Sequence, residues 1–202
     1  MTIRRLSLYT RCLAQLEEDG IKTISSQGFA ERFQLNSAQV RKDLAYFGEF
    51  GVRGIGYYVS SLRAELQKIL GLDREWRVAL VGFGNLGSAL FRYRGFAREG
   101  FRVAAIVDDD PAKLGRTANG LAILPLAELP RAVKQSGIQI GVIAVPAEAA
   151  QLVADRLVAA GVRAILNFAP ARLRVPREVR LQNVDLSIEL ENLSFHLAQG
   201  TR

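Results

Sequence analysis

The stretch VALVGFGNLGSAL at residues 78–90 restricts the fold of this chain more than any other feature. An apolar, β-branched run leads directly into Gly82-x-Gly84-x-x-Gly87, and a helix-forming run follows. The first two glycines allow a tight turn and a close approach to a diphosphate, and the third lets the helix pack on the strand. Free N–H groups at the start of the helix then face the phosphates. The pattern predicts the opening strand, turn and helix of a dinucleotide-binding Rossmann domain.

A carboxylate lies where such a domain needs one for the ribose of the cofactor. The run FRVAAIVDDD predicts a second strand that ends at Asp108, about 20 residues after Gly87, as expected for an acid that binds ribose hydroxyls. Asp109 and Asp110 extend the negative charge and would repel a 2′-phosphate. We therefore predict NAD(H) rather than NADP(H); the alternative is a glycine loop that serves packing, beside a surface acid.

The alternation of strands and helices continues beyond this point. The apolar strands IQIGVIAVP and VRAILNFAP, with the helix AEAAQLVADRLVAAG between them, indicate a parallel sheet covered on both faces. Ligands bind beyond the carboxyl ends of such strands, so we expect Val145, Pro146, Asn167 and Phe168 to rim the cofactor pocket. The alternative is that these residues only end their strands.

The first 75 residues differ in character and follow the pattern of a helix-turn-helix domain. Apolar residues at helical spacing predict a first helix over residues 3–16. After a short strand-like IKTI, Ser25 or Ser26 can cap a second helix, QGFAERF. A tight turn follows, and Ser37 can cap a third helix, AQVRKDLAYF, which Gly48 ends.

The third helix combines an apolar inner face with basic and polar outer residues. Val40, Leu44 and Phe47 share the inner face, and the helix follows the layout in which a recognition helix enters the major groove. The glycine-rich segment 48–59 predicts a β-hairpin wing with an arginine near its tip, suited to phosphate or minor-groove contact. We predict DNA contacts from Ser37, Gln39, Arg41, Lys42, Tyr46 and Arg53. The alternative is a solvated helix face and a connecting hairpin.

Composition limits the partners and the compartment. The net charge is +7, but the excess is spread over both parts of the chain, so charge alone does not establish DNA binding. No apolar run approaches the roughly 20 residues of a membrane span, and the start lacks the features of a signal peptide. A single cysteine, Cys12, excludes an internal disulfide and a cysteine-based zinc site. We expect a cytoplasmic protein without a metal or a membrane partner, in which Cys12 is a small buried residue rather than a thiol sensor.

Four motifs in this order resemble one family over nearly the whole chain. They are VRKDLAYFGEFGVRGIGY, VGFGNLGSAL, AVPAEAAQ and ILNFAPARL, and together they resemble Rex, the bacterial redox-sensing transcriptional repressor. The resemblance implies a homodimer that binds palindromic operator DNA through winged helices and releases it when NADH occupies the Rossmann domains. It also implies cofactor contacts from Asp108 and from the loop formed by Gly82, Phe83, Gly84, Asn85, Leu86 and Gly87.

The end of the chain predicts a helix that needs two covering surfaces. Asp185 can cap it, and Leu186, Leu190, Leu193 and Leu197 form one apolar stripe, with a second stripe on another face. One reading is a helix folded back on its own domain. The Rex resemblance implies instead a helix swapped into the partner, where Asp185 pairs with Arg11 in the DNA-binding domain or with Tyr93 near the cofactor. Some family members have an aromatic residue where this chain has Leu186.

The expected fold is therefore α/β. It comprises an N-terminal winged helix-turn-helix domain (1–75), a Rossmann-like parallel-sheet domain (76–184) and a C-terminal domain-swapped helix (185–202). The inferred nicotinamide end offers little to compensate a cation, because it is lined by Val145, Pro146, Phe168, Ala169 and Pro170. Burial of a charged ring there costs free energy, so we expect NADH to bind more tightly than NAD+.

Two functions other than repression fit parts of the sequence. A small NAD-dependent dehydrogenase needs a proton donor and a substrate region, yet the only histidine is His196, in the closing helix. No constellation points to a catalytic residue, so we do not expect an enzyme. A CoA-binding module is nearer, because similar Rossmann folds hold CoA. Binding of NADH without turnover would distinguish a sensor from an enzyme.

Overall fold

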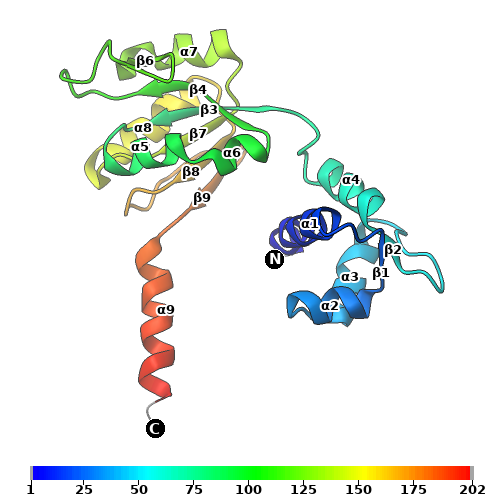
Figure 1. The fold of residues 1–202 in the computed structure, drawn as a ribbon. Helices are drawn as coiled ribbons and strands as arrows, with labels where there is room; N and C mark the ends of the chain where they lie inside the picture. Colours follow the sequence, from blue (N-terminus) through cyan, green and yellow to red (C-terminus); the bar gives the residue numbers. More distant parts are fainter. Residues whose placement is uncertain (1, 201–202) are drawn as a thin grey trace. The chain divides into compact units, whose positions relative to one another are not determined.

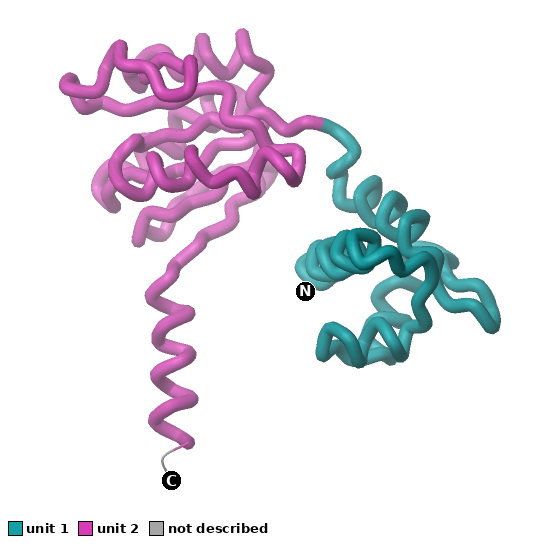
Figure 2. The backbone as a smooth tube through the Cα atoms, in the orientation of Figure 1, with its two compact units in different colours: residues 1–74 teal, residues 75–202 magenta. Residues whose placement is uncertain are grey.

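The computed structural model describes residues 2–200 and divides the chain into two compact units, residues 1–74 and 75–202 (Figure 2). The predicted domain ends at residues 1 and 202 lie outside the described residues, and so does Thr201. The predicted closing helix groups with the second unit.

The first unit is mostly helical. Its elements are α1 (Thr2–Glu18), β1 (Thr23–Ile24), α2 (Ser26–Phe33), α3 (Ser37–Phe47), β2 (Tyr57–Tyr58) and α4 (Val59–Ile69). Apolar residues at helical spacing place Leu6, Leu13 and Leu16 of α1 in the core with Val40 and Leu44 of α3. The predicted inner face of the third helix is thus confirmed, and Cys12 is buried as expected.

The caps of the second and third helices are local side-chain contacts. Ser25 caps α2 as predicted, because its hydroxyl accepts from the backbone N–H of Gly28 at 3.0 Å. The predicted cap at Ser37 is wrong. Asn36 caps α3 through a 2.9 Å bond from the N–H of Gln39 to its Oδ1, and Ser37 is the first helical residue. Asparagine and serine are about equally favoured at this position, so spacing alone did not separate them.

The predicted wing exists as a tight turn with little strand structure. Val52 and Gly56 form one antiparallel bridge, and Arg53 lies in the turn between them. Tyr57 pairs with Ile24 of β1 instead of extending the hairpin. Gly56 has φ 93°, and a Cβ there would collide with the Ile24 backbone, so only glycine fits where the wing meets β1.

The second unit is built on a seven-stranded sheet in the order β5-β6-β4-β3-β7-β8-β9 (Figure 1). Its elements are β3 (Trp76–Val81), α5 (Asn85–Arg92), α6 (Arg94–Arg98), β4 (Phe101–Val107), β5 (Thr117–Ala118), β6 (Leu121–Leu124), the 3-10 turn η1 (Leu126–Glu128), α7 (Leu129–Ser136), β7 (Ile140–Ile143), α8 (Ala147–Ala159), β8 (Ala164–Asn167), β9 (Arg180–Asn183) and α9 (Leu186–Gln199). All pairs are parallel except β5 with β6. The strand order is that of a doubly wound dinucleotide-binding fold. This confirms the predicted α/β class with a Rossmann-like sheet, and the predicted domain swap of the closing helix stays a prediction.

Both faces of this sheet are apolar, as the continuous apolar strands predicted. On one face Val81, Val107 and Ile143 pack with residues of α7 and α8. On the other face Val78, Leu80 and Val142 pack with residues of α5. The sheet is therefore packed on both faces. This packing holds the carboxyl ends of its strands, from which the loops of the site begin.

Helix α9 begins at its predicted cap and extends away from the sheet of its unit (Figure 1). Asp185 accepts a 2.9 Å bond from the N–H of Ser187, which confirms the cap. None of residues 186–199 is buried, and Leu190 and Leu193 are 67% and 61% exposed. Within residues 2–200 no helix has the length and apolarity to cross a membrane, and no group of His, Cys, Asp or Glu could hold a metal ion.

Candidate functional site

A cavity of about 360 Å³ lies beyond the carboxyl ends of β3, β4 and β7. The chain runs from β3 to β4 on one side and returns to β7 on the other, so the cavity sits where the strand order reverses. This is where open α/β sheets bind their ligands. Its lining residues come mainly from the loops that follow these strands: Val81, Gly82, Gly84, Val107, Asp108, Asp109, Asp110, Lys113, Leu126, Ala144, Val145, Pro146, Ala149, Leu152 and Val153.

The three glycines of the loop have different roles. Gly82 has φ 95°, and a Cβ there would overlap the Ala144 backbone, because β3 and β7 lie close together at this point. A Cβ at Gly87 would collide with the Gly82 carbonyl, so this glycine allows α5 to pack against the turn. A Cβ at Gly84 meets nothing within 4 Å. Gly82 and Gly87 thus shape the loop, and Gly84 leaves space where a diphosphate would approach.

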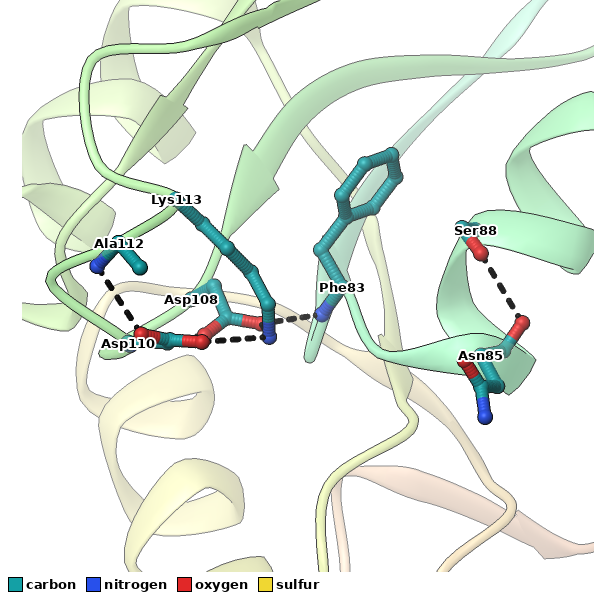
Figure 3. Close-up of polar contacts among 7 residues, drawn as sticks. All are labelled: Phe83, Asn85, Ser88, Asp108, Asp110, Ala112 and Lys113. Carbon is teal, nitrogen blue, oxygen red and sulfur yellow. Dashed lines mark hydrogen bonds and ion pairs between the residues drawn. The ribbon is translucent and has the colours of Figure 1, made fainter.

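Asp108 is held at the edge of this cavity by three donors (Figure 3). Its carboxylate accepts from the backbone N–H of Phe83 at 2.6 Å, from that of Asp110 at 2.8 Å, and from Lys113 Nζ at 3.1 Å. Burial raises the pKa of Asp108, but the hydrogen bonds from Asp110, Phe83 and Lys113 outweigh it and hold the pKa below its usual value. Asp108 is therefore an ionised acceptor in a fixed position.

Several predicted cofactor contacts lie elsewhere around the loop. The Phe83 ring points away from Asp108 (Figure 3). It packs against Phe91, with 5.7 Å between the ring centroids. Only its backbone takes part, through the bond to Asp108. Asn85 and Leu86 start α5 with exposed side chains, outside the cavity lining.

The expectation that Asn167 and Phe168 rim the pocket is not met by the lining of this cavity. Asn167 is 1% exposed, and its amide group donates to the Ala169 carbonyl and to Asn183 Oδ1 while accepting from the Ala169 N–H. The side chain is therefore occupied in shaping the loop after β8. Phe168 packs with Val78 and Leu80 on the face of the sheet that α5 covers. The predicted Val145 and Pro146 do line the cavity.

Sequence reasoning missed Lys113, which lines the cavity beside Asp108. Its Nζ lies 3.1 Å from Asp108 Oδ2 and 3.4 Å from Asp110 Oδ2. The hydrogen bond from Lys113 to Asp108 raises the pKa of the lysine. The sequence offered one signal for this residue, because Lys113 follows the acidic run 108–110 by three positions.

The predicted DNA-contacting residues gather on α3 and the wing. Arg41, Lys42 and Arg53 are exposed, and Tyr46 is 81% exposed. Arg41 donates to the Ser26 hydroxyl at 3.1 Å, and Gln39 donates to Asp43 at 2.8 Å. Tyr46 is a large aromatic side chain that stays exposed on the same helix as the cations Arg41 and Lys42. Such an exposed surface is typical of a binding site for a partner molecule.

Asp43 anchors this helix and was also missed by sequence reasoning. It is 3% exposed, forms an ion pair with Arg5 that includes a 2.7 Å bond from Nη2, and accepts from the Tyr9 hydroxyl at 2.9 Å. The hydrogen bond from Arg5 lowers the pKa of Asp43 to about 2, and burial raises the pKa of Tyr9 to about 12. The cluster ties α3 to α1.

The predicted switch residues are all available to a partner. Arg11 is exposed on α1, and Tyr93 is 62% exposed with its ring against Phe96. Asp185, Leu190 and Leu193 are exposed on or beside α9. Arg11 belongs to the first unit, and the other four belong to the second.

Comparisons with known proteins cover both units. Residues 1–45 match the family described as putative DNA-binding protein N-terminus, and residues 73–171 match the CoA binding domain family. The redox-sensing transcriptional repressors Rex of Desulfitobacterium hafniense and Syntrophomonas wolfei are each 54% identical over 201 residues. The alignments span 100% of this chain and 95% and 96% of those proteins. This chain belongs to the Rex family.

Solved structures of RSP, which is described as a Rex-family repressor, agree with this Rex membership. RSP in complex with β-NAD+ and operator DNA matches with a TM-score of 0.95 and 38% identity, over 99% of this chain and 92% of that one. RSP in complex with β-NADH matches with a TM-score of 0.89 and 37% identity, over 99% and 94%. Rex-family proteins are transcriptional repressors, so the prediction of a repressor rather than an enzyme is confirmed. The CoA alternative corresponds to a shared domain fold, because the CoA binding domain family matches residues 73–171, whereas the Rex protein of Desulfitobacterium hafniense matches over the whole chain.

Proposed function

We propose that this Rex-family chain represses transcription as a homodimer on palindromic operator DNA and releases the DNA when NADH fills the cavity above β3 and β7. The observation that carries the proposal is that one chain contains both a cofactor cavity and a DNA-binding helix, the two parts that a sensor needs. A dinucleotide cavity edged by Asp108 lies in one unit, and an exposed basic recognition helix lies in the other. The RSP complexes with NADH, and with NAD+ and operator DNA, support the same pairing of ligands.

The preference for NADH rests on the polarity of the inferred nicotinamide end. Val145, Pro146, Ala149 and Leu152 line that side of the cavity, and none of them compensates a positive charge. Transfer of the NAD+ ring into such surroundings costs more than transfer of the neutral dihydronicotinamide. NADH should therefore bind more tightly, and only a difference in affinity between DNA-bound and DNA-free states can drive release. Equal calorimetric affinities for NADH and NAD+ would contradict this account.

DNA reading is assigned to the start of α3 and to the wing. Arg41→Ala with Lys42→Ala should weaken operator binding by about 2–6 kcal/mol, because each side chain contributes on the scale of a base or phosphate contact. NADH affinity should not change, since the cavity lies in the other unit. Arg172→Ala with Arg174→Ala is a matched control, because it removes the same charge from exposed positions of the second unit. A gel-shift titration in which the α3 variant binds like this control would refute the assignment.

The dimer is assigned to α9. Its leucines remain more than half exposed in a single chain, and an amphipathic helix of this kind is stable when a second surface covers it. We place the helix in the partner subunit, between its two units. A cytoplasmic location follows from this role, since operator DNA and the NADH pool are found there in bacteria.

Coupling between the two sites is assigned to Asp185. At the start of the swapped helix, its carboxylate would pair with Arg11 of the DNA-binding unit in one state and with Tyr93 in the other. Asp185→Ala should then retain NADH binding and DNA binding but lose the effect of NADH on DNA. Glu189→Ala, an exposed acid on the same helix, is the control. Normal release of DNA by NADH in the Asp185 variant would exclude this latch.

A further inference from the structure

The acceptor capacity of Asp108 is nearly used up before any ligand binds. An ionised carboxylate offers about four lone-pair positions. Oδ1 accepts from Asp110, and Oδ2 accepts from both Phe83 and Lys113. About one position is left for a ribose hydroxyl.

The adenosine ribose of a dinucleotide presents two neighbouring hydroxyls, each able to donate and to accept. One can donate to the remaining position on Asp108, and the other then needs a separate partner. Lys113 Nζ carries three N–H donors, and Asp108 and Asp110 take two of them at 3.1 Å and 3.4 Å. The third donor is free to point into the cavity, which Lys113 lines with 31% of its side chain exposed.

We propose that Lys113 is a second ribose-binding residue, whose ammonium group donates to one adenosine-ribose hydroxyl while Asp108 accepts from the other. The proposal rests on the proposed function, namely that this cavity holds NADH. The geometry also bears on specificity. Lys113 is shared by two carboxylates, and Asp109 adds a third acid to the cavity, so a 2′-phosphate would meet net negative charge. A ribose with two free hydroxyls would instead meet one donor, the Lys113 ammonium group, and one acceptor, the Asp108 carboxylate.

The simpler role for Lys113 is to hold Asp108 in place. The two roles differ in their response to the ligand. A lysine that only positions Asp108 changes the affinity for every ligand that uses Asp108. A lysine that bonds a hydroxyl directly loses its effect on a ligand that lacks this hydroxyl.

The experiment measures binding of the full chain by calorimetry to NADH and to its 2′-deoxy and 3′-deoxy analogues in the adenosine ribose. Lys113→Met should weaken NADH binding by about 10-fold to 100-fold, the scale of a hydrogen bond from a charged group. Lys113→Arg should restore part of the loss. Lys134→Met removes an exposed lysine of α7 outside the cavity lining and should bind like the wild type.

The analogues decide between the roles. The wild type should bind both deoxy analogues about 10-fold more weakly than NADH. In Lys113→Met, one of the two penalties should disappear, because its protein partner has been removed. Lys113→Gln is the second variant if the methionine variant does not fold, and it should reduce the same penalty.

Two outcomes overturn the proposal. One is an affinity of Lys113→Met for NADH within about twofold of the wild type. The other is that both analogue penalties persist in the variants, which would leave Lys113 with the positioning role only. Failure of the wild-type chain to bind NADH at all would instead overturn the proposed function, so the two failures are distinguishable.

Discussion

Replacement of Asp43 by Asn should loosen the recognition helix from the rest of its unit. The substitution preserves the shape of the side chain but removes its negative charge. Arg5 and Tyr9, both on α1, donate hydrogen bonds to this carboxylate. The new amide also places N–H donors where the guanidinium donates, so at least one donor in the cluster loses its acceptor. The second unit does not share this cluster and should keep its stability.

The magnitude follows from the pKa of the carboxyl. A fall from 3.8 to about 2 corresponds to roughly 2 kcal/mol of free energy of unfolding at neutral pH. Loss of one partner of a fully buried pair costs about 3–5 kcal/mol. Arg5 is 33% exposed and can be partly hydrated, which lowers that figure. We expect a loss of about 2–3 kcal/mol for the first unit.

Hydrogen exchange followed by mass spectrometry is the suitable assay, because it reports each segment of the full chain separately. Peptides from α1 and α3 should lose protection in Asp43→Asn, and peptides from β3 and β4 should not. Asp19→Asn is the matched control, since its pair with Arg32 is about 40% exposed on each side and should contribute at most about 1 kcal/mol.

The pH dependence gives an independent check with a defined sign. The folded pKa of Asp43 is depressed, so its contribution is complete above the unfolded pKa near 3.8 and is lost as the pH falls toward 2. The stability gap between wild type and variant should therefore close over that range in urea unfolding followed by circular dichroism. Unchanged protection of α1 and α3 in the variant, or a gap constant with pH, would show that Asp43 does not anchor α3.

Three further predictions concern the other parts of the chain. Gly84→Ala should fold normally, because its Cβ meets nothing within 4 Å, yet bind NADH at least about 10-fold more weakly by calorimetry; unchanged affinity would place the diphosphate elsewhere. A chain that ends at Val184 should be monomeric or unfolded in sedimentation, and an intact dimer would refute the role of α9. Burial raises the pKa of Cys12, so its thiol should resist alkylation at neutral pH until urea unfolds the first unit; rapid alkylation of the native chain would contradict this.

The sequence by itself determined the features that depend on neighbouring residues. The glycine loop, the strand that ends before Asp108, the cap at Asp185 and the inner face of α3 all follow from patterns within one or two turns of chain. The doubly wound order was also predictable, since strands that alternate with helices have few ways to pack. These features were enough to indicate both a cofactor and a DNA partner.

Only the tertiary structure decided which polar side chains serve the site and which serve the fold. Asp43 meets Arg5 across 38 positions of sequence, and Asp108 meets the backbone of Phe83 across 25. Asn167 follows an apolar strand like a ligand residue, yet its amide is satisfied by Asn183 and the loop after β8. A buried polar group must find a partner, but no local pattern states which partner the folded chain brings to it. The acid at the edge of the cavity was therefore predictable, and the lysine that donates to its carboxylate was not.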